Sequence, residues 1–444
     1  MTNLEKKLNA DRLLKFFLGA FLFFLPWQTI WIYSEPFVNG TKWEYGVLGY
    51  FGTEILLWLS VVFFIAWYFK KLRFKLQTSN FSLRPTKDRI FVLSCLVFIF
   101  YLFLSNFWAV NNSLAIQQSF RVMEAFLLFF ILYLSPLSFD SAIKWFVAGA
   151  IIPAVLGVWQ FFIQSTFASK FFGLAQHQVW QAGTSIISGS EIGRWLRAYG
   201  SFSHPNIFGG YLLIVLAMLF LCLVKKLKLY KVTKYRILLL AIYCLLLTAL
   251  FFTFSRSAWL AFLLLILAYL FISWKEKNKQ SIFIVVSTLL LFVLVTIFFP
   301  LVQNRLVEQS LSEARSVSER IEGYGEALTL FKTHPWFGVG AGNYTAQLIF
   351  QNSTLSGSAY QPVHNVFLLV LDELGLIGLF LFLLVIYFFT RQESIVIFKN
   401  KYLLFFISYL SLIMFDHYLY SSYVGLMLGA ILFAMLFRHE FITE

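Results

Sequence analysis

The sequence predicts an all-α fold, a polytopic membrane helical bundle with about twelve transmembrane helices. Of its 444 residues, 60% are apolar and 13% are charged, whereas soluble domains carry about a quarter charged residues. The apolar residues occur in blocks of about 20, the length of one bilayer crossing. The segments between these blocks alternate in Lys and Arg content, as the loops of a membrane protein do. Together these observations exclude an ordinary soluble protein.

The apolar blocks define the predicted spans in order along the chain. They cover residues 13–33, 46–69, 90–108, 114–135, 142–164, 205–224, 236–254, 257–274, 281–301, 363–390, 402–417 and 422–438. Much of the net charge of +14 lies in two of the loops between them, residues 70–89 and 225–235. The positive-inside rule places such loops in the cytoplasm. We therefore expect cytoplasmic termini and attribute the charge to membrane orientation, with no nucleic-acid partner.

Two long segments interrupt the regular array, residues 166–204 and 302–362, and both fall on the outer face in this topology. In the second segment four apolar residues recur at helical spacing: Ile321, Tyr324, Leu328 and Phe331. This pattern predicts an amphipathic helix that lies at the membrane interface within a long outer-face loop. We expect the chemistry of the protein to lie in these outer segments.

Three arginines on the predicted outer face run against the positive-inside rule. Arg197 precedes the sixth span, Arg256 lies between spans seven and eight, and Arg320 lies in the amphipathic segment. A charge at the hydrocarbon boundary costs about 2.5–3.5 kcal/mol or more, and guanidinium groups bind phosphate oxygens in bidentate fashion. The arginines therefore suggest an anionic ligand. The alternative is that each one reaches lipid headgroups or pairs with a nearby acid.

The start of the tenth span contributes ionisable side chains of its own. His364 is suited to act as a general base because an imidazole titrates near neutral pH, although a single histidine can also serve only as a cap. At 100° per residue, Asp372 lies roughly 80° from His364 around a helix, whereas Glu373 lies on the far side. Asp372 is thus the better candidate to line the same cavity. A structural pairing of Asp372 with an arginine is the competing interpretation.

The motifs that are missing also restrict the chemistry. No Asp-x-Asp pair occurs on an outer segment and no His/Cys cluster has metal-ligand spacing, so the sequence predicts neither a metal site nor a cofactor. The glycine-rich turn at residues 338–342 lacks the Gly-Lys-Ser/Thr ending of a nucleotide loop. A nucleotide-independent reaction on the outer face needs a donor that is already activated. A lipid-linked diphosphate is the obvious class.

Four motifs in this order resemble the O-antigen ligase and Wzy-type polymerase family. The motifs are Arg-Ala-Tyr-Gly-Ser-Phe-Ser-His-Pro-Asn at 197–206, Phe-Ser-Arg-Ser-Ala-Trp at 254–259, the stretch 320–344 with its His-Pro-Trp-Phe-Gly-Val-Gly, and the stretch from Pro-Val-His-Asn at 362–365 to Leu-Gly-Leu-Ile-Gly at 374–378. The resemblance covers roughly residues 195–380, which we assign as the catalytic region. Residues 1–194 and 381–444 are then N-terminal and C-terminal transmembrane regions.

The resemblance implies a metal-independent membrane glycosyltransferase of the GT-C type that uses an undecaprenyl-diphosphate-linked glycan as donor. Carried over by position, Arg197, Arg256 and Arg320 would hold the diphosphate, and His364 would take the proton from the acceptor hydroxyl. Further substrate-binding candidates in these motifs are Asn206, Asn365 and Asp372. The expected location is the bacterial cytoplasmic (inner) membrane, with the active site on the outer face and a role in lipopolysaccharide or other surface polysaccharide assembly.

Two alternatives stay open at this point. The motifs do not separate a ligase, which moves a glycan onto a lipid, glycan or protein acceptor, from a polymerase, which extends the polymer. A transporter or flippase of lipid-linked sugars would also have twelve spans and a charged interior. Transporters commonly have interrupted spans near the midplane, and the apolar pattern of this sequence predicts no such pair. We therefore favour an enzyme.

Overall fold

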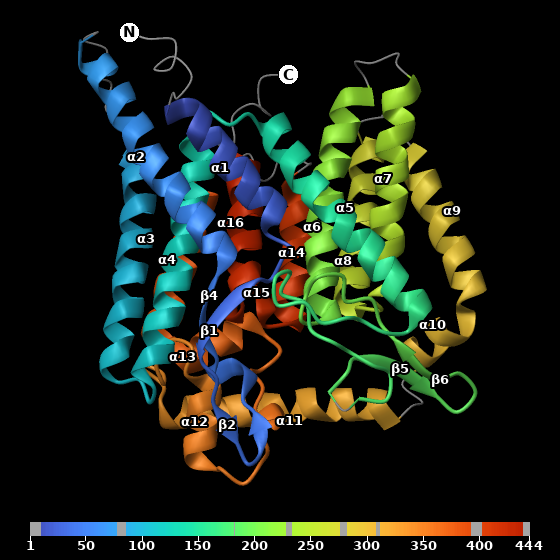
Figure 1. Cartoon of the computed structure of the whole chain (residues 1–444). Helices are drawn as coiled ribbons and strands as arrows, with labels where there is room; N and C mark the ends of the chain where they lie inside the picture. Colours follow the sequence, from blue (N-terminus) through green and yellow to red (C-terminus); the bar gives the residue numbers. More distant parts are fainter. Residues whose placement is uncertain are drawn as a thin grey trace.

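The computed structural model of the chain describes residues 10–77, 86–181, 183–227, 233–275, 282–307, 311–391 and 402–437. Long helices form a bundle, and shorter elements cover one of its ends (Figure 1). The helices of the bundle are α1 (Ala10–Phe24), α2 (Gly52–Gln77), α3 (Thr86–Leu104), α4 (Asn112–Leu134), α5 (Phe139–Ile163), α6 (Pro205–Leu227), α7 (Thr233–Phe252), α8 (Arg256–Lys275), α9 (Ile282–Ile297), α13 (Val366–Thr390), α14 (Tyr402–Phe415) and α16 (Tyr423–Phe437). The shorter helices are α10 (Phe299–Leu306), α12 (Tyr344–Gln351) and α15 (Tyr418–Ser421), and α11 (Leu311–Thr333) lies across the covered end.

The mostly helical membrane fold predicted from the sequence is confirmed, because each predicted span has a helix at its position. Within the described residues, five helices are long and apolar enough to cross a bilayer: Gly52–Leu72, Arg89–Phe107, Asn112–Leu134, Phe139–Ile163 and Val366–Thr390. A sixth crossing results if α9 and α10 count as one bent span. Other apolar helices, including α6, α7, α8, α14 and α16, are shorter over their described residues. The count of twelve crossings stays a prediction, and most of the basic loops that set the predicted orientation lie outside the described residues.

The described part of the chain is not purely helical, because it includes three short antiparallel sheets that lie outside the bundle. The first predicted span ends at Phe24, just before Pro26, and β1 (Ile30–Ser34) pairs with β4 (Leu48–Phe51) where helix was expected. The run Ile-Trp-Ile-Tyr is apolar enough to extend a span but consists of β-branched and aromatic residues, which favour strands. The other pairs are β2 (Phe37–Val38) with β3 (Thr41–Lys42) and β5 (Ile186–Gly189) with β6 (Gly193–Leu196).

Two of the predicted spans are interrupted, contrary to the expectation of unbroken helices. The ninth bends by 90° between α9 and α10, where Pro300 lies in the first turn of α10 and cannot continue the hydrogen-bond ladder of α9. The tenth, α13, contains Gly375 with a φ of 68°. Both interruptions lie within apolar runs, so hydropathy alone could not reveal them.

A glycine-rich turn fills the gap in α13. Pro335 and Trp336 carbonyls accept from the N–H groups of Leu376 and Ile377, while the N–H groups of Val339 and Gly340 donate to the Asp372 and Glu373 carbonyls. A Cβ on Gly375 would lie 2.2 Å from the Trp336 carbonyl oxygen. The sequence Gly-Val-Gly-Ala-Gly is thus explained by backbone docking onto a broken helix.

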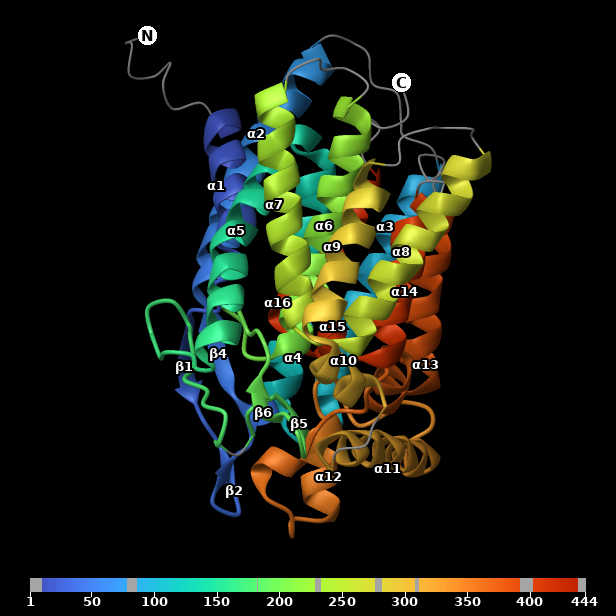
Figure 2. The same ribbon diagram turned by 90° about the vertical axis from the view of Figure 1, so that its right-hand side faces the viewer.

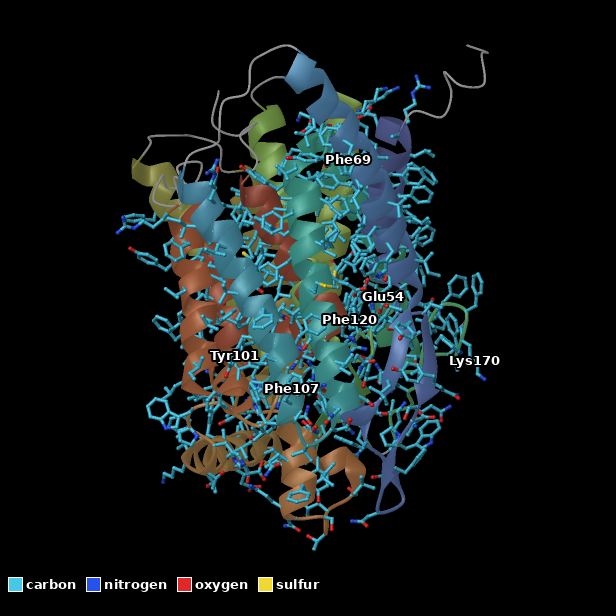
Figure 3. The ribbon with its side chains drawn as sticks, turned by 90° about the vertical axis from the view of Figure 1, so that its left-hand side faces the viewer. Glu54, Phe69, Tyr101, Phe107, Phe120 and Lys170 are labelled. Atoms are coloured by element: carbon cyan, nitrogen blue, oxygen red, sulfur yellow. The ribbon has the colours of Figure 1, made fainter. Side chains whose placement is uncertain are left out.

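The short elements cluster at one end of the bundle, which we call the capped end; it comprises the three sheets, α10, α11 and α12. The first residues of α1 and the last of α16 lie at the opposite end (Figures 1 and 2). A view from another side shows Phe69 toward that opposite end of α2, with Glu54 at the start of α2 and Phe107 after α3 lying nearer the capped end (Figure 3). The two ends of the bundle are therefore structurally distinct.

The predicted amphipathic helix is present as α11, but its buried face differs from the predicted stripe. Ala327 and Leu330 are each 1% exposed, whereas Ile321 and Leu328 are 66% and 54% exposed. Arg320 lies seven residues before Ala327, hence on the same, inward face of the helix. Ile321 and Leu328 are thus turned away from the rest of the protein, and the location of their stripe at a membrane interface stays a prediction.

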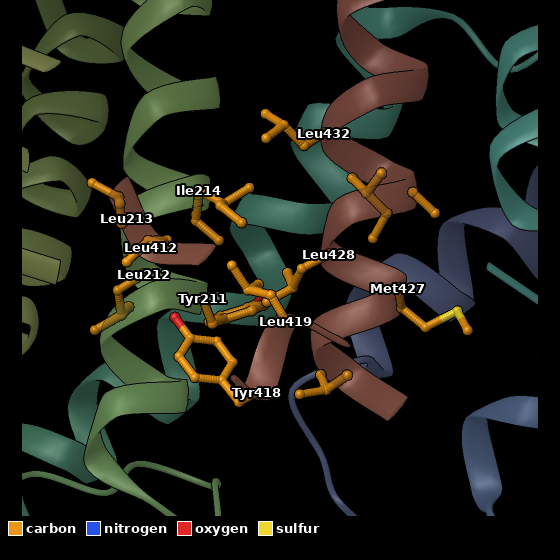
Figure 4. Packing of buried hydrophobic residues seen from close by; sticks show 14 of the residues in the cluster. Tyr211, Leu212, Leu213, Ile214, Leu412, Tyr418, Leu419, Met427, Leu428 and Leu432 are labelled. Carbon is orange, nitrogen blue, oxygen red and sulfur yellow. The ribbon is translucent and has the colours of Figure 1, made fainter. Parts of the chain in front are cut away.

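Tight packing between α6, α15 and α16 brings two distant parts of the chain together. Tyr211 of α6 lies against Leu419 of α15 and Leu428 of α16 in the core (Figure 4). At Gly210, an added Cβ would lie 1.8 Å from the Tyr418 hydroxyl oxygen, so only glycine permits this approach. The same contact places the start of α6 beside the end of α14.

Candidate active site

His364 lies directly before α13 at the capped end of the bundle. Asn365 is the N-cap of α13, because its Oδ1 accepts from the Leu368 N–H at 3.1 Å. Its Nδ2 donates to the Met414 carbonyl at 3.3 Å. Both ends of the Asn365 side chain are thus used to hold the start of α13, which fixes the backbone next to His364.

A buried carboxylate faces the imidazole of His364. Asp416, which follows α14 and is 3% exposed, places Oδ1 3.5 Å from His364 Nδ1. This is an ion-pair separation and is longer than a well-formed hydrogen bond. The His364 side chain is 22% exposed, yet its Nδ1 is buried. The accessible part of the ring therefore lies away from Asp416.

Asn206 connects this carboxylate to an arginine on another segment. Its Nδ2 donates to Asp416 Oδ2 at 3.0 Å, and its Oδ1 accepts from Arg197 Nη2 at 2.6 Å. Arg197, which is 4% exposed, also donates from Nε to the Thr253 carbonyl at 2.7 Å. Three of the predicted site residues, Arg197, Asn206 and His364, are therefore joined into one network through Asp416.

His204 supports the Arg197 end of the network. Its Nδ1 accepts from the Asn206 N–H at 3.1 Å, so the neutral ring carries its proton on Nε2, 3.0 Å from Ser185 Oγ. Arg197 Nη1 donates to the same Ser185 Oγ at 3.2 Å. Burial, together with the neighbouring Arg197 charge, lowers the pKa of His204 to about 3. His204 is accordingly neutral at physiological pH.

A second histidine, His417, packs beside His364 with ring centroids 5.1 Å apart. Its Nδ1 is 2.7 Å from Ser421 Oγ and its Nε2 is 3.4 Å from the Tyr45 hydroxyl. Tyr45 comes from the segment between α1 and α2, so a fourth part of the chain reaches the site. No motif in the sequence signalled this contribution.

Among the described residues, His364, Asp416 and His417 are grouped closely enough to raise the question of a metal, since their ligand atoms all lie within 4.8 Å of one another. Two imidazoles and a carboxylate form a donor set that suits zinc. Here both His417 nitrogens and both Asp416 oxygens already have partners within the chain. Arg320 also lies near enough for its positive charge to act on both residues. These features favour a hydrogen-bonded network over a bound cation.

The remaining predicted arginines also lie at this end of the molecule. Arg256 is the first residue of α8, two residues after the Phe254 carbonyl that accepts from Arg305 Nε at 2.9 Å. Arg320 is half-buried in α11, and its positive charge acts on Asp416 and His417. Arg197, Arg256 and Arg320 thus reach the capped end from three different segments.

Of the two acids on α13, Glu373 has the clearer structural role. Its Oε2 accepts from the Gly342 N–H at 2.7 Å and from the Tyr420 hydroxyl at 3.1 Å. Asp372 is 1% exposed, with Oδ2 buried and without a hydrogen-bond partner among the described residues. It acts electrostatically on Tyr344, whose pKa is raised by burial and then by this negative charge. The contacts described do not link Asp372 to His364.

The fold and the site together define a class of protein: an integral membrane helical bundle with a network of arginine, asparagine, aspartate and histidine at one end. Residues 240–383 match the family model described as O-antigen ligase. This match confirms the family resemblance and supports a general function like that of O-antigen ligases and polymerases. Arg256, Arg320 and His364 lie within the matched region, whereas Arg197, Asn206 and Asp416 lie outside it. Comparison with curated proteins finds no match.

Sequence reasoning gave too little weight to several members of the site. Asp416, Tyr45 and Arg305 were not among the residues selected from the sequence. Each belongs to a segment far along the chain from the residue that it contacts, so only the packed structure brings them together. The presence of Asp416 at the end of an apolar helix was the one available signal, because a carboxylate there is costly unless it has partners.

Proposed function

We propose that the protein is an extracytoplasmic glycosyltransferase that moves a glycan from an undecaprenyl-diphosphate donor to an acceptor hydroxyl in surface polysaccharide assembly. The observation that carries this proposal is the network that runs from Arg197 through Asn206 and Asp416 to His364. In this network the Asp416 carboxylate lies between Arg197, whose guanidinium is suited to bind phosphate, and His364, the proposed general base. The O-antigen ligase family match supports the same class of reaction.

In the proposed reaction, His364 is the base. With Nδ1 directed at Asp416, a neutral imidazole that carries its proton on Nδ1 leaves Nε2 to accept the proton of the acceptor hydroxyl. The negative charge of Asp416 then stabilises the imidazolium that forms. Asp416 acts as an orienting group for His364 and does not need to exchange protons itself.

The arginines act on the other side of the reaction. As the acceptor oxygen forms its bond to the anomeric carbon, the bond from that carbon to the donor phosphate breaks, and its electron pair stays on the leaving diphosphate. Arg197, Arg256 and Arg320 would neutralise this charge, which is the largest change in electrostatics along the reaction. Because guanidinium groups supply the positive charge, no divalent metal is required for this step.

Ligase and polymerase share this chemistry and differ only in the acceptor. A ligase couples a glycan once to each lipid, glycan or protein acceptor, whereas a polymerase yields a ladder of products of increasing length. The two interrupted spans are also compatible with a transporter of lipid-linked sugars. The extended network around His364 favours catalysis, since a transporter has no need of a base that faces an acceptor.

Two variants test the assignment in a purified, reconstituted protein. His364→Ala should abolish glycan transfer while leaving donor binding within about 3-fold of the wild type, because the imidazole acts only on the acceptor hydroxyl. Arg197→Ala should weaken donor binding. Near-normal transfer by both variants would show that the site lies elsewhere, and transport of the donor without transfer would favour the flippase.

A further inference from the structure

Three charged side chains on the side of the bundle take no part in the proposed reaction. Glu54 lies in the first turn of α2, and Arg121 and Glu124 lie on α4, which packs against α2. Both helices are apolar and long enough to cross a bilayer. The two glutamates are buried and Arg121 is half-buried. Ionisable side chains within membrane spans are costly, so this group calls for a functional explanation.

The guanidinium of Arg121 donates no hydrogen bond to any of the described residues, and its Nε is buried without a partner. Its Cζ lies 5.6 Å from the centroid of the Phe51 ring, and that ring stacks on Tyr423 with centroids 4.6 Å apart. A guanidinium carries five N–H donors along its edge. The aromatic ring therefore covers one face of the group and satisfies none of its donors.

The two glutamates act on Arg121 without touching it. Both negative charges act on the guanidinium, that of Glu54 more strongly, yet within the described part of the chain neither carboxylate pairs with it. Glu54 Oε1 accepts from the Phe51 N–H at 3.0 Å, and Glu124 Oε1 accepts from Trp58 Nε1 at 2.8 Å. The other oxygen of each carboxylate has no hydrogen-bond partner among the same residues. Unpaired donors thus lie near unpaired acceptors, with two negative charges to one positive charge.

The surroundings of these charges face the membrane. Ile55 and Trp58 on α2 and Phe120 on α4 are exposed apolar side chains next to the charged group in the sequence. Figure 3 shows Glu54 and Phe120 on the same side of the bundle. Because Glu54 lies in the first turn of its span, the charges lie near the end of the apolar region, where lipid headgroups begin. A headgroup can therefore reach the half-buried Arg121 while its chains pack on the apolar side chains.

The balance of charge selects the kind of headgroup. A phosphate group accepts hydrogen bonds from a guanidinium in bidentate fashion. A lipid with a net negative charge would also place that charge beside two glutamates, which repel it. A zwitterionic headgroup adds an ammonium that can donate to the unpaired oxygen of Glu54. The exposed ring of Tyr33, near enough for the charges of Arg121 and Glu54 to act on it, adds an aromatic face that attracts a cation.

We propose that Arg121 and Glu54 form a binding site for a membrane phospholipid with a phosphoethanolamine headgroup. Arg121 donates to the phosphate oxygens, and Glu54 accepts from the ammonium. Glu124, which Trp58 holds in place, adds the second negative charge that disfavours an anionic lipid. The proposal is independent of the transfer reaction at His364.

The test compares three short-chain phospholipids for binding to the purified, delipidated, full-length protein in a non-ionic detergent, measured by native mass spectrometry. Phosphatidylethanolamine should bind at least about 10-fold more tightly than phosphatidylglycerol, because phosphatidylglycerol carries no ammonium. Phosphatidylcholine should lie between them, since its quaternary ammonium has no N–H to donate. Equal affinities for the three lipids would overturn the inference.

Variants of the two proposed ligands separate their roles. Arg121→Gln should weaken phosphatidylethanolamine binding about 10- to 100-fold, the range expected for loss of a charge-assisted contact. Arg121→Lys should recover part of this affinity, because it restores the charge without the fork. Glu54→Gln keeps an acceptor for the Phe51 N–H, and it should weaken phosphatidylethanolamine binding while strengthening phosphatidylglycerol binding. An unchanged lipid preference in folded Arg121→Gln and Glu54→Gln variants would contradict the proposed site.

Arg391 supplies a matched control. Its guanidinium also lies over an aromatic ring, with Cζ 5.1 Å from the centroid of Tyr387, but it is exposed and lies at the other end of α13 from His364. Arg391→Gln should leave the three affinities unchanged, and a loss equal to that of Arg121→Gln would overturn the inference.

Thermal unfolding distinguishes loss of the lipid from loss of the fold. The midpoint without lipid shows whether each variant is folded. Phosphatidylethanolamine should raise the wild-type midpoint, because a ligand that binds the folded state stabilises it, and it should raise that of Arg121→Gln less. An equal rise for wild type and folded Arg121→Gln would show that the lipid binds elsewhere.

Discussion

Replacement of Asp416 by asparagine removes the charge opposite His364 and keeps the size of the side chain. At the observed 3.5 Å, a full charge pair at an effective dielectric constant of 20 would be worth at most about 5 kcal/mol. The long contact and the neighbouring positive charge of Arg320 reduce this value. The range measured for hydrogen bonds to charged groups, about 1.5–3 kcal/mol, is the better guide. It corresponds to a fall in kcat of about 10- to 150-fold.

The donor KM of Asp416→Asn should change by less than about 3-fold, since Arg197 keeps its contacts with Thr253 and Ser185. The assay is steady-state glycan transfer in proteoliposomes, with donor and acceptor varied separately. Glu124→Gln is a matched control, because Glu124 is also a buried carboxylate and accepts from Trp58 Nε1 at 2.8 Å; this variant should retain its kcat. A normal kcat in folded Asp416→Asn would refute the role given to the carboxylate.

Three other predictions concern stability. The pKa of His204 is about 3 in the folded protein and about 6.5 when unfolded, so neutral His204 contributes fully to the free energy of unfolding above pH 6.5, and this contribution falls by about 2 kcal/mol at pH 5. The thermal unfolding midpoint should therefore drop between pH 6.5 and pH 5. A His204→Gln variant whose midpoint drops as steeply would contradict the low pKa of His204. Gly375→Ala should destabilise the protein by more than about 1 kcal/mol, because a Cβ there would clash with the Trp336 carbonyl and φ is 68°. Gly325→Ala is the control and should not destabilise the protein, because its Cβ would meet nothing within 4 Å. Equal unfolding midpoints for the two variants would contradict the packing of the glycine-rich turn against the break in α13. Glu373→Ala should lower the thermal unfolding midpoint in detergent. Glu373→Gln should keep most of the wild-type midpoint, because its amide oxygen can still accept from the two donors. A Glu373→Ala variant as stable as the wild type would show that Glu373 does not stabilise the fold.

The sequence predicted the helices well because each apolar block is long enough to dominate local structure. It failed where backbone geometry mattered more than hydropathy. The bend after α9 and the break at Gly375 lie inside apolar runs, and the strand Ile30–Ser34 continues the first apolar block. In each case the deciding factor, a proline, a glycine or a strand partner, contributes almost nothing to average hydrophobicity.

The candidate site was predicted in part for a similar reason. Arg197 and His364 could be selected from the sequence, because an ionisable side chain at a membrane boundary is costly and therefore suggests a functional role. The same reasoning did not identify the partner of His364, since Asp416 follows a different helix. Asn206 was expected to bind substrate; its amide oxygen accepts from Arg197 and its amide nitrogen donates to Asp416. Which polar groups contact one another depends on packing, and a single sequence does not encode that in any local pattern.

The central claim is that transfer proceeds from a lipid-linked diphosphate with no nucleotide and no divalent metal. The most direct measurement is product formation by the purified protein from an undecaprenyl-diphosphate-linked oligosaccharide and an acceptor, with EDTA present and ATP absent. We predict transfer at the same rate as with added magnesium or zinc, and none with His364→Ala. A rate that depends on ATP or on a divalent metal would contradict the account.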